Sequence, residues 1–211
     1  MATTTAPKQR SDTAEQILDL AETLIQTRGY SAFSYQDIAD SLGIRKASIH
    51  YHFPSKADLG VAVVDRYMAR FGDALSAIAD DQSQSSMTML DFYVQPYLQF
   101  ASTPDRVCLS GALAGEMMAL PPKVRERVDH FFKTHQIWLT EILKRGVTRG
   151  EFKLAAPASK VARFVFGALQ GALLVKRTTN DLSQINDVIA VMKLQLAARS
   201  SGIMAHTPQE I

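Results

Sequence analysis

Residues 34–56 form the segment that most restricts how this chain can fold. Ser34 is followed three positions later by Asp37, the spacing at which a capping box begins a helix. Apolar residues recur at helical spacing from there to Gly43, a residue type that permits the positive φ with which many helices end. A second helical pattern follows and stops at Pro54, because the residue before a proline is disfavoured in the helical region. The segment predicts two short helices joined by a tight turn, with a third helix after the proline.

The second short helix, at about residues 46–52, has an apolar side and a polar side. Ile49 and Phe53 are spaced to bury the apolar side together. Two helices joined by a tight turn can place the second in the major groove of DNA, which makes the polar side a candidate DNA-reading surface. The alternative is a solvated helical hairpin, since charged helix faces usually just meet water. The side chains of this candidate surface are Arg45, Lys46, Ala47, Ser48, His50, Tyr51 and His52, followed by Lys56 after the proline.

Bulk charge does not decide between these interpretations. The chain has a net charge of +2, and residues 1–56 contain six Lys or Arg against six Asp or Glu. DNA affinity would therefore depend on cations gathered on one face. With 46% hydrophobic and 21% charged residues, the chain has an ordinary globular composition. Its single cysteine excludes an internal disulfide, and a reducing, cytoplasmic location is expected.

The order of these residues resembles the DNA-binding motif of the TetR family of bacterial repressors. The resemblance implies that Tyr51, His52 and Lys56 contact DNA phosphates, which position a protein without specifying sequence. It also implies that base contacts come from the first residues of the second short helix. The matching positions are Ile38-Ala39, Gly43, Lys46, Tyr51-His52-Phe53, Ser55-Lys56 and Leu59.

Three positions depart from the family pattern. The family usually has Ser or Thr at the position of Arg45, so the second short helix lacks its usual cap. It usually has Gly where this chain has Ala47, and an aromatic residue where this chain has His50. Arg45 or Lys46 could read a guanine edge and Ala47 could touch a thymine methyl group, so the operator preference cannot be carried over from relatives.

The rest of the chain carries helical patterns without sustained strand alternation. We predict an all-α fold of about nine helices, which the resemblance also implies. An N-terminal arm at residues 1–10 and the helix-turn-helix DNA-binding domain would together span residues 1–56, and a ligand-binding and dimerisation domain would span residues 57–211. Asp12 with Glu15 resembles a capping box for the first helix. The later helices are expected at residues 56–79, 87–101, 106–120, 123–149, 157–179 and 186–199.

The helices expected at residues 157–179 and 186–199 have two interpretations. Their apolar residues could form core, or two copies could make a four-helix bundle at a two-fold interface. The resemblance favours the interface, and a protein that reads a palindrome needs two recognition helices about 34–36 Å apart. Gly167 and Gly171 would permit close helix approach. We therefore predict a homodimer through these helices, with the apolar residues Val161, Phe164, Val165, Ala168, Leu169, Ala172, Leu173, Ile185, Val188, Ile189, Met192 and Leu196.

The second half of the chain lacks a fixed family motif, so we interpret it from its chemistry. Aromatic and apolar residues with a few polar tips gather on its middle helices. That mixture suits a small-molecule pocket between helices, and it also suits an ordinary core; the resemblance favours a pocket. The candidate ligand-binding residues are Phe92, Tyr93, Tyr97, Cys108, Glu116, Phe131, His135 and Trp138.

Two of these candidates stand out. Glu116 lies in an otherwise uncharged helix, where it could bind a cationic or hydroxylated ligand, pair with a neighbouring Arg or His, or face water. Cys108 begins the same helix, a position at which a thiol can gain reactivity. The stretch from Cys108 through Glu116 to Leu120-Pro121 resembles a subgroup of the family that senses reactive electrophiles or small unsaturated acids, although Val107 replaces the usual glycine. The alternative is a buried, inert Cys108 that packs as a small hydrophobe.

We therefore expect a ligand-responsive transcriptional repressor that binds a palindromic operator in double-stranded DNA as a dimer and is released by a small-molecule inducer. The alternatives are a helical protein-interaction scaffold without DNA binding and a ligand-dependent activator. We do not expect an enzyme, a metal or a cofactor, because the histidines lack acidic or thiol partners at metal-ligand spacing and no Gly-rich phosphate loop is present. The apolar window at residues 161–175, interrupted by Arg163, is expected to be too short for a membrane span.

Overall fold

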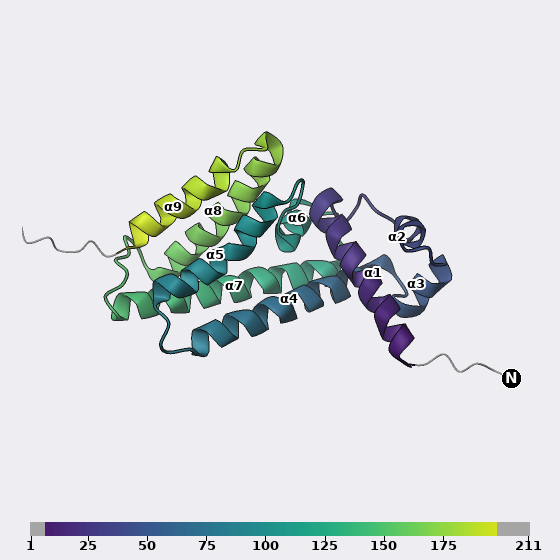
Figure 1. The fold of residues 1–211 in the computed structure, drawn as a ribbon, viewed down its shortest axis with the longest axis horizontal. Coiled ribbons are helices and arrows are strands. Elements are labelled where there is room, and N and C mark those ends of the chain that lie inside the picture. The colour runs from purple at the N-terminus through teal and green to yellow at the C-terminus, as the bar shows by residue number, and fades with distance from the viewer. Residues whose placement is uncertain (1–6, 198–211) are drawn as a thin grey trace, which may run out of the picture.

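The computed structural model describes residues 7–197, with side chains from residue 12 onward. Over that range the chain folds into nine α-helices, and its one β feature is an isolated bridge between Phe152 and Ala197 (Figure 1). The predicted all-α class is confirmed. From the sequence we also expect residues 202–211 to be frayed, and these lie outside the described residues. The helices are α1 (Pro7–Arg28), α2 (Tyr35–Leu42), α3 (Lys46–His52), α4 (Lys56–Asp80), α5 (Ser86–Ser102), α6 (Leu109–Gly115), α7 (Pro122–Thr148), α8 (Ala158–Thr179) and α9 (Ser183–Leu196).

The start and the end of α2 follow from local hydrogen bonding, as predicted. The Ser34 hydroxyl accepts from the amides of Gln36 and Asp37, and the Asp37 carboxylate accepts from the Ser34 amide at 2.7 Å. The hydrogen bonds from Ser34 hold the pKa of Asp37 below its usual value. Gly43 ends the helix with a φ of 65°, a left-handed conformation that is costly for residues with a Cβ. These two caps set the turn that orients α3.

The largest differences from the predicted helix boundaries are in α1 and α6. α1 begins at Pro7, so residues 7–10 of the predicted arm are helical and Asp12 lies inside the helix rather than at its cap. Proline is tolerated at the first helical position because an amide there would have no partner, so the helix can begin before Asp12. α6 is shorter than expected, because the chain after Gly115 continues in tight turns with i→i+3 hydrogen bonds.

α4 joins the three-helix N-terminal module to the larger domain (Figure 1). It begins with a capping box between Ser55 and Asp58, and it packs against α1 and along α7. The Trp138 indole of α7 donates to the Leu75 carbonyl of α4 at 3.0 Å, which fastens the two long helices together. α2 and α3 lie at one end of the molecule, beyond α1, and α4 carries the chain from that end into the larger domain.

The apolar stripe predicted for the dimer interface is mostly buried within the single chain, so its assignment to an interface was wrong. Val165, Leu169 and Leu173 of α8 are buried, as are Ile189 and Met192 of α9. α8 packs against α5, α7 and α9, and the most apolar side of a helix faces its neighbours within the chain. The outer side of the two helices and the turn between them carry a second apolar set, of which the prediction included one member. This outer set comprises Phe164, Leu174, Val175, Leu182, Val191 and Leu194.

By length and composition alone, α8 is long and apolar enough to cross a membrane, contrary to the expectation from its sequence window. The apolar window expected from the sequence ends before Lys176, whereas the helix continues to Thr179 and Lys176 is buried. One such helix is weak evidence for a membrane span, because core helices of soluble proteins pass the same test. Here α8 packs against three other helices of the chain.

Candidate functional site

α3 presents the candidate DNA-reading surface at one end of the molecule (Figure 1). Ile49 is fully buried and Phe53 is 8% exposed, so the opposite side of α3 faces outward. Tyr51, by contrast, exposes 66% of its surface. The structure thus brings the predicted residues of this helix together on one accessible face. The exposed members are Arg45, Lys46, Ala47, His50 and Tyr51, and the half-buried members are Ser48 and His52.

Local contacts orient α3 even though it lacks a side-chain cap. The His50 ring lies 4.8 Å from the Tyr35 ring, and its Nδ1 lies 3.2 Å from the Pro54 carbonyl oxygen. The Tyr35 hydroxyl donates to the Phe53 carbonyl at 2.8 Å, which ties α2 to the end of α3. Arg45 occupies the cap position without a side-chain hydrogen bond, as its departure from the family pattern predicted. A missing Ser or Thr cap costs about 1 kcal/mol, so packing on α2 has to hold this short helix.

Lys56 differs from the other predicted phosphate contacts, because its ammonium group is engaged within the protein. Nζ donates to the Phe33 carbonyl, and it lies 4.7 Å and 4.3 Å from the ring centroids of Tyr30 and Phe33. Desolvation by these neighbours lowers the pKa of Lys56. The lysine therefore ties the start of α4 to the chain between α1 and α2, and its phosphate contact stays a prediction.

A cavity of about 390 Å³ lies among α4, α5 and α7, a size typical of small-molecule sites. Phe and Tyr side chains are the largest group in its wall, and the charged side chains that line it lie together and form its polar end. The structure therefore brings together most of the predicted ligand-binding residues, and their role in binding stays a prediction. The predicted residues that line the cavity are Phe92, Tyr93, Tyr97, Cys108, Phe131 and His135.

The hydroxyl and imidazole groups of the cavity wall are uncharged at neutral pH. The Tyr93 hydroxyl lies 3.1 Å from His135 Nδ1, and the Gln170 amide donates to the Tyr97 hydroxyl oxygen at 3.3 Å. Burial raises the pKa of Tyr93 and of Tyr97, and it lowers the pKa of His135 to about 4. These groups can therefore donate or accept hydrogen bonds, but they supply no charge to a ligand.

Glu116 and Trp138 do not line this cavity, in contrast to the other predicted ligand-binding residues. The Glu116 carboxylate accepts from the Ser31 amide at 2.8 Å and lies against Gly29, where the chain leaves α1. Trp138 stacks behind the wall on Tyr93, with ring centroids 5.3 Å apart. Glu116 thus joins the larger domain to the N-terminal module, and Trp138 supports a residue of the cavity.

Cys108 lies on the cavity wall and is 3% exposed. It occupies the cap position of α6, and its Sγ lies 3.7 Å from the Tyr67 hydroxyl oxygen. These contacts also fit the alternative of an inert, well-packed thiol. Electrophile sensing by Cys108 therefore stays a prediction.

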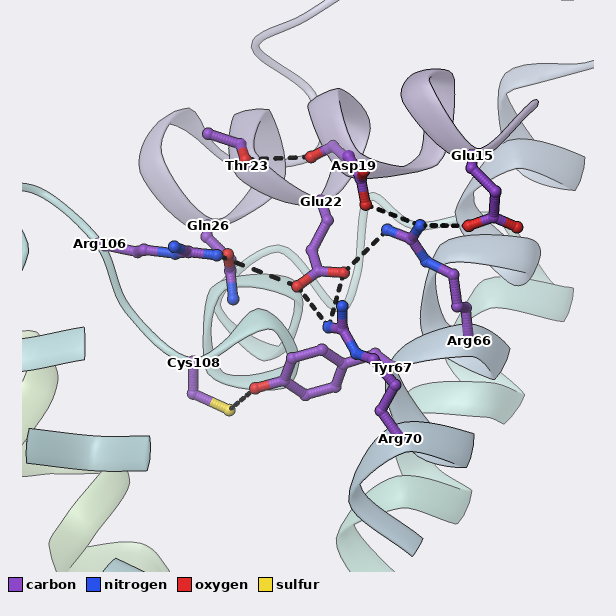
Figure 2. A network of polar contacts seen from close by, with 10 residues as sticks. All are labelled: Glu15, Asp19, Glu22, Thr23, Gln26, Arg66, Tyr67, Arg70, Arg106 and Cys108. Carbon is purple, nitrogen blue, oxygen red and sulfur yellow. Dashed lines mark hydrogen bonds and ion pairs between the residues drawn. The ribbon is translucent and has the colours of Figure 1, made fainter. Parts of the chain in front are cut away.

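A charged cluster that the sequence did not predict lies at the polar end of the cavity (Figure 2). Glu22 of α1 is 5% exposed, and its carboxylate accepts from Arg70 at 2.7 Å and 2.9 Å and from Arg66 at 3.2 Å. Arg106 lies 4.0 Å from Glu22 and donates through Nε to the Gln26 side chain at 2.7 Å. The sequence signal for this cluster was an acidic residue within the apolar stripe of α1.

An outward-facing second helix after a glycine turn is the architecture of helix-turn-helix DNA-binding proteins. Here α4 connects that module to a larger helical domain that contains a cavity of ligand size. The fold and the two sites define the class of DNA-binding regulators that carry their own ligand-binding domain.

Comparisons with known families identify the particular family. Residues 17–63 match the family of bacterial regulatory proteins described as the tetR family. Residues 87–192 match the family described as the Tetracyclin repressor-like C-terminal domain. The chain therefore belongs to the TetR family of transcriptional regulators, as its motif predicted.

Relatives and solved structures agree with this assignment. The chain is 28% identical over 186 residues to an uncharacterised HTH-type transcriptional regulator of Lactococcus lactis subsp. lactis, covering 86% of this chain and 92% of the relative. It is 25% identical over 138 residues to IcaR, the negative transcriptional regulator of the biofilm operon icaADBC in Staphylococcus aureus, covering 60% of this chain and 73% of IcaR. A TetR-family regulator of Agrobacterium tumefaciens superimposes with a TM-score of 0.84 at 31% identity, covering 90% of this chain and all of that one.

Proposed function

We propose that this protein is a ligand-responsive repressor that binds a palindromic operator as a homodimer and releases it when a small molecule fills the cavity. The observation that carries the DNA-binding part is the exposed, acid-free face of α3 beginning with Arg45 and Lys46. Similarity to IcaR, a negative regulator, favours repression over activation. The family is regulatory rather than enzymatic, and we propose a cytoplasmic location. We also propose that the DNA-binding domain ends near residue 56, where α4 begins.

The salt dependence of DNA binding tests this proposal against a protein-interaction scaffold. A duplex from the region upstream of the protein's own gene would be titrated by fluorescence anisotropy at several salt concentrations. Lys46→Met should weaken binding and make it less dependent on salt, because it removes a cation from the side of α3 that would face the DNA. Lys133→Met, which removes an exposed lysine of α7, is the matched control and should leave the slope unchanged. No binding to the duplex even in dilute buffer would contradict the proposal.

The outer set on α8 and α9 supports a homodimer. A helix pair whose outer side is apolar needs a cover, and a second copy of the same pair makes a two-fold four-helix bundle. Cβ atoms added at Gly167 or Gly171 would meet nothing within 4 Å, so the protomer itself does not use the space beside these glycines. We therefore still propose that α8 and α9 form the dimer interface, but through the outer set rather than through the apolar residues predicted from the sequence.

Light scattering after size exclusion checks the dimer. Phe164→Glu places a charge on a well-exposed member of the outer set and should give monomers at micromolar concentration. Ile137→Glu alters a comparably exposed apolar residue of α7, outside the outer set, and should stay dimeric. A monomeric unmodified protein under the same conditions would count against the proposal.

α4 is the element through which a ligand would act on DNA binding. It forms part of the cavity wall through Tyr67, Phe71 and Leu75, and its first turn follows the helix-turn-helix directly. A ligand that favours a shifted α4 would change the separation of the two recognition helices in the dimer. That arrangement has two sites and one shared element, as allosteric coupling requires.

A further inference from the structure

We propose that the cavity binds an aromatic carboxylic acid, and that its carboxylate competes with Glu22 of the DNA-binding domain for Arg70 and Arg106. The inference rests on the proposed function, because it names the chemical class of the inducer and the contact through which it acts. The charged cluster in Figure 2 supports this proposal, because it lies at the cavity and also joins α1 to the larger domain.

The polar end of the cavity has an excess of positive charge. Among the described residues that line it, the charged ones are a single carboxylate, Glu22, and two guanidinium groups, Arg70 and Arg106. The third guanidinium nearby, Arg66, is also bound by two other acids of α1, at 2.8 Å each. One further anionic group would therefore balance the charge of the lining, whereas an amine would be repelled.

Both arginines have donors left for a ligand. A guanidinium group has five N–H donors in a planar fork that matches a carboxylate. Arg70 contacts Glu22 through Nη2, and Arg106 contacts Gln26 through Nε. Their side chains are 51% and 33% exposed, whereas Glu22 is buried, so a ligand entering the cavity can reach both arginines.

The rest of the cavity suits a flat apolar body. Phe71, Tyr93, Tyr97 and Phe100 contribute ring faces and edges, and the phenols are uncharged. Aromatic rings pack against such walls in offset or edge-on arrangements. The Arg106 guanidinium lies over the Phe100 ring, 5.7 Å from its centroid, which places the charge beside the apolar wall. A planar ring bearing one carboxylate satisfies both parts of the site.

The same contacts couple ligand binding to the DNA-binding domain. Glu22 belongs to α1, whereas Arg70 belongs to α4, so their ion pair links the two domains. A buried carboxylate is stable only while it is paired. A ligand carboxylate that takes Arg70 or Arg106 weakens that pairing and favours a different position of α1. Acid binding and operator binding should therefore oppose each other by the same factor.

Calorimetric titration without DNA tests the binding site. The probes are benzoate, cinnamate and 2-naphthoate, each compared with its neutral carboxamide of the same size. We expect at least one acid to bind about tenfold or more tightly than its amide, the range for hydrogen bonds to a charged group. Arg70→Met and, as a milder second variant, Arg106→Met should remove this preference. Arg127→Met, which breaks an exposed pair with Asp65 away from the cavity, should retain it.

Two outcomes of this titration would overturn the proposal. One is that no acid binds more tightly than its amide. The other is that the preference survives in both Arg70→Met and Arg106→Met while far-UV circular dichroism shows both variants folded. Because no DNA is present, the result is independent of whether the protein binds an operator.

Glu22→Gln tests the competition. The amide keeps the shape of the side chain but removes its charge, so the arginines should bind the acid about tenfold more tightly. Glu15→Gln, which removes an acid that pairs with Arg66 on the outer side, is the matched control and should have little effect. Unchanged or weaker acid binding by a folded Glu22→Gln protein would overturn the competition. With an operator duplex present, the acid should raise the dissociation constant of the unmodified protein and have a smaller effect on Glu22→Gln.

Discussion

Mild acid should destabilise this protein through His135 of α7. The side chain is 5% exposed, and desolvation lowers its pKa from 6.5 to about 4. As the pH falls through about 6.5, the unfolded chain binds a proton here, but the folded protein does not until about pH 4. The unfolded state therefore binds more protons in this window, and the free energy of unfolding falls as the pH falls. The loss is about 2 kcal/mol per chain between about pH 7.5 and 5, and about 3 kcal/mol below both pKa values.

Urea unfolding at a series of pH values, followed by far-UV circular dichroism at one protein concentration, measures this loss. His135→Asn removes the titration and places an amide near the Nδ1 position, 3.1 Å from the Tyr93 hydroxyl. It also loses ring packing on Phe131, whose centroid lies 3.9 Å away, so the pH dependence rather than the absolute stability is compared. His130→Asn, at an exposed position of the same helix, is the control. Equal pH dependence in the unmodified protein and His135→Asn would refute the reasoning.

Three other perturbations test the packing and the caps. Gly146→Ala should lower the free energy of unfolding by about 1–3 kcal/mol in the same urea titration, because the added Cβ would lie 2.1 Å from the Phe152 ring. Gly72→Ala, whose Cβ would meet open space, should raise the free energy of unfolding by about 0.5–1 kcal/mol. Lys56→Met should lower the free energy of unfolding by about 1.5–3 kcal/mol, measured by thermal unfolding, since its ammonium group donates to the carbonyl of the buried residue Phe33. An unchanged melting temperature together with a smaller salt slope of DNA binding would assign Lys56 to a phosphate contact instead. Ser34→Ala should cost about 1 kcal/mol and Ser34→Thr much less; equal melting temperatures for the two would contradict the cap.

The DNA-binding module could be predicted from the sequence because its geometry depends on contacts between near neighbours. The hydrogen bonds between Ser34 and Asp37 span three residues, and the left-handed turn needs only Gly43. The helical spacing of residues likewise predicted that Ile49 lies on the buried side of α3 and Lys46 on the exposed side. The start of α1 was predicted too late in the chain, because proline is tolerated at the first helical position and the helix begins at Pro7.

Tertiary structure alone decided which partners the remaining side chains meet. Periodicity identified apolar sides of α8 and α9, but it could not tell that neighbouring helices of the same chain cover Leu169 and leave Phe164 outside. Glu22, Arg70 and Arg106 come from three segments far apart in the sequence, and their charges meet only because α1 crosses α4 beside the chain that leads into α6. A helical pattern fixes the direction of a side chain from its own axis, whereas a binding site needs the relative placement of several axes, which depends on long-range packing.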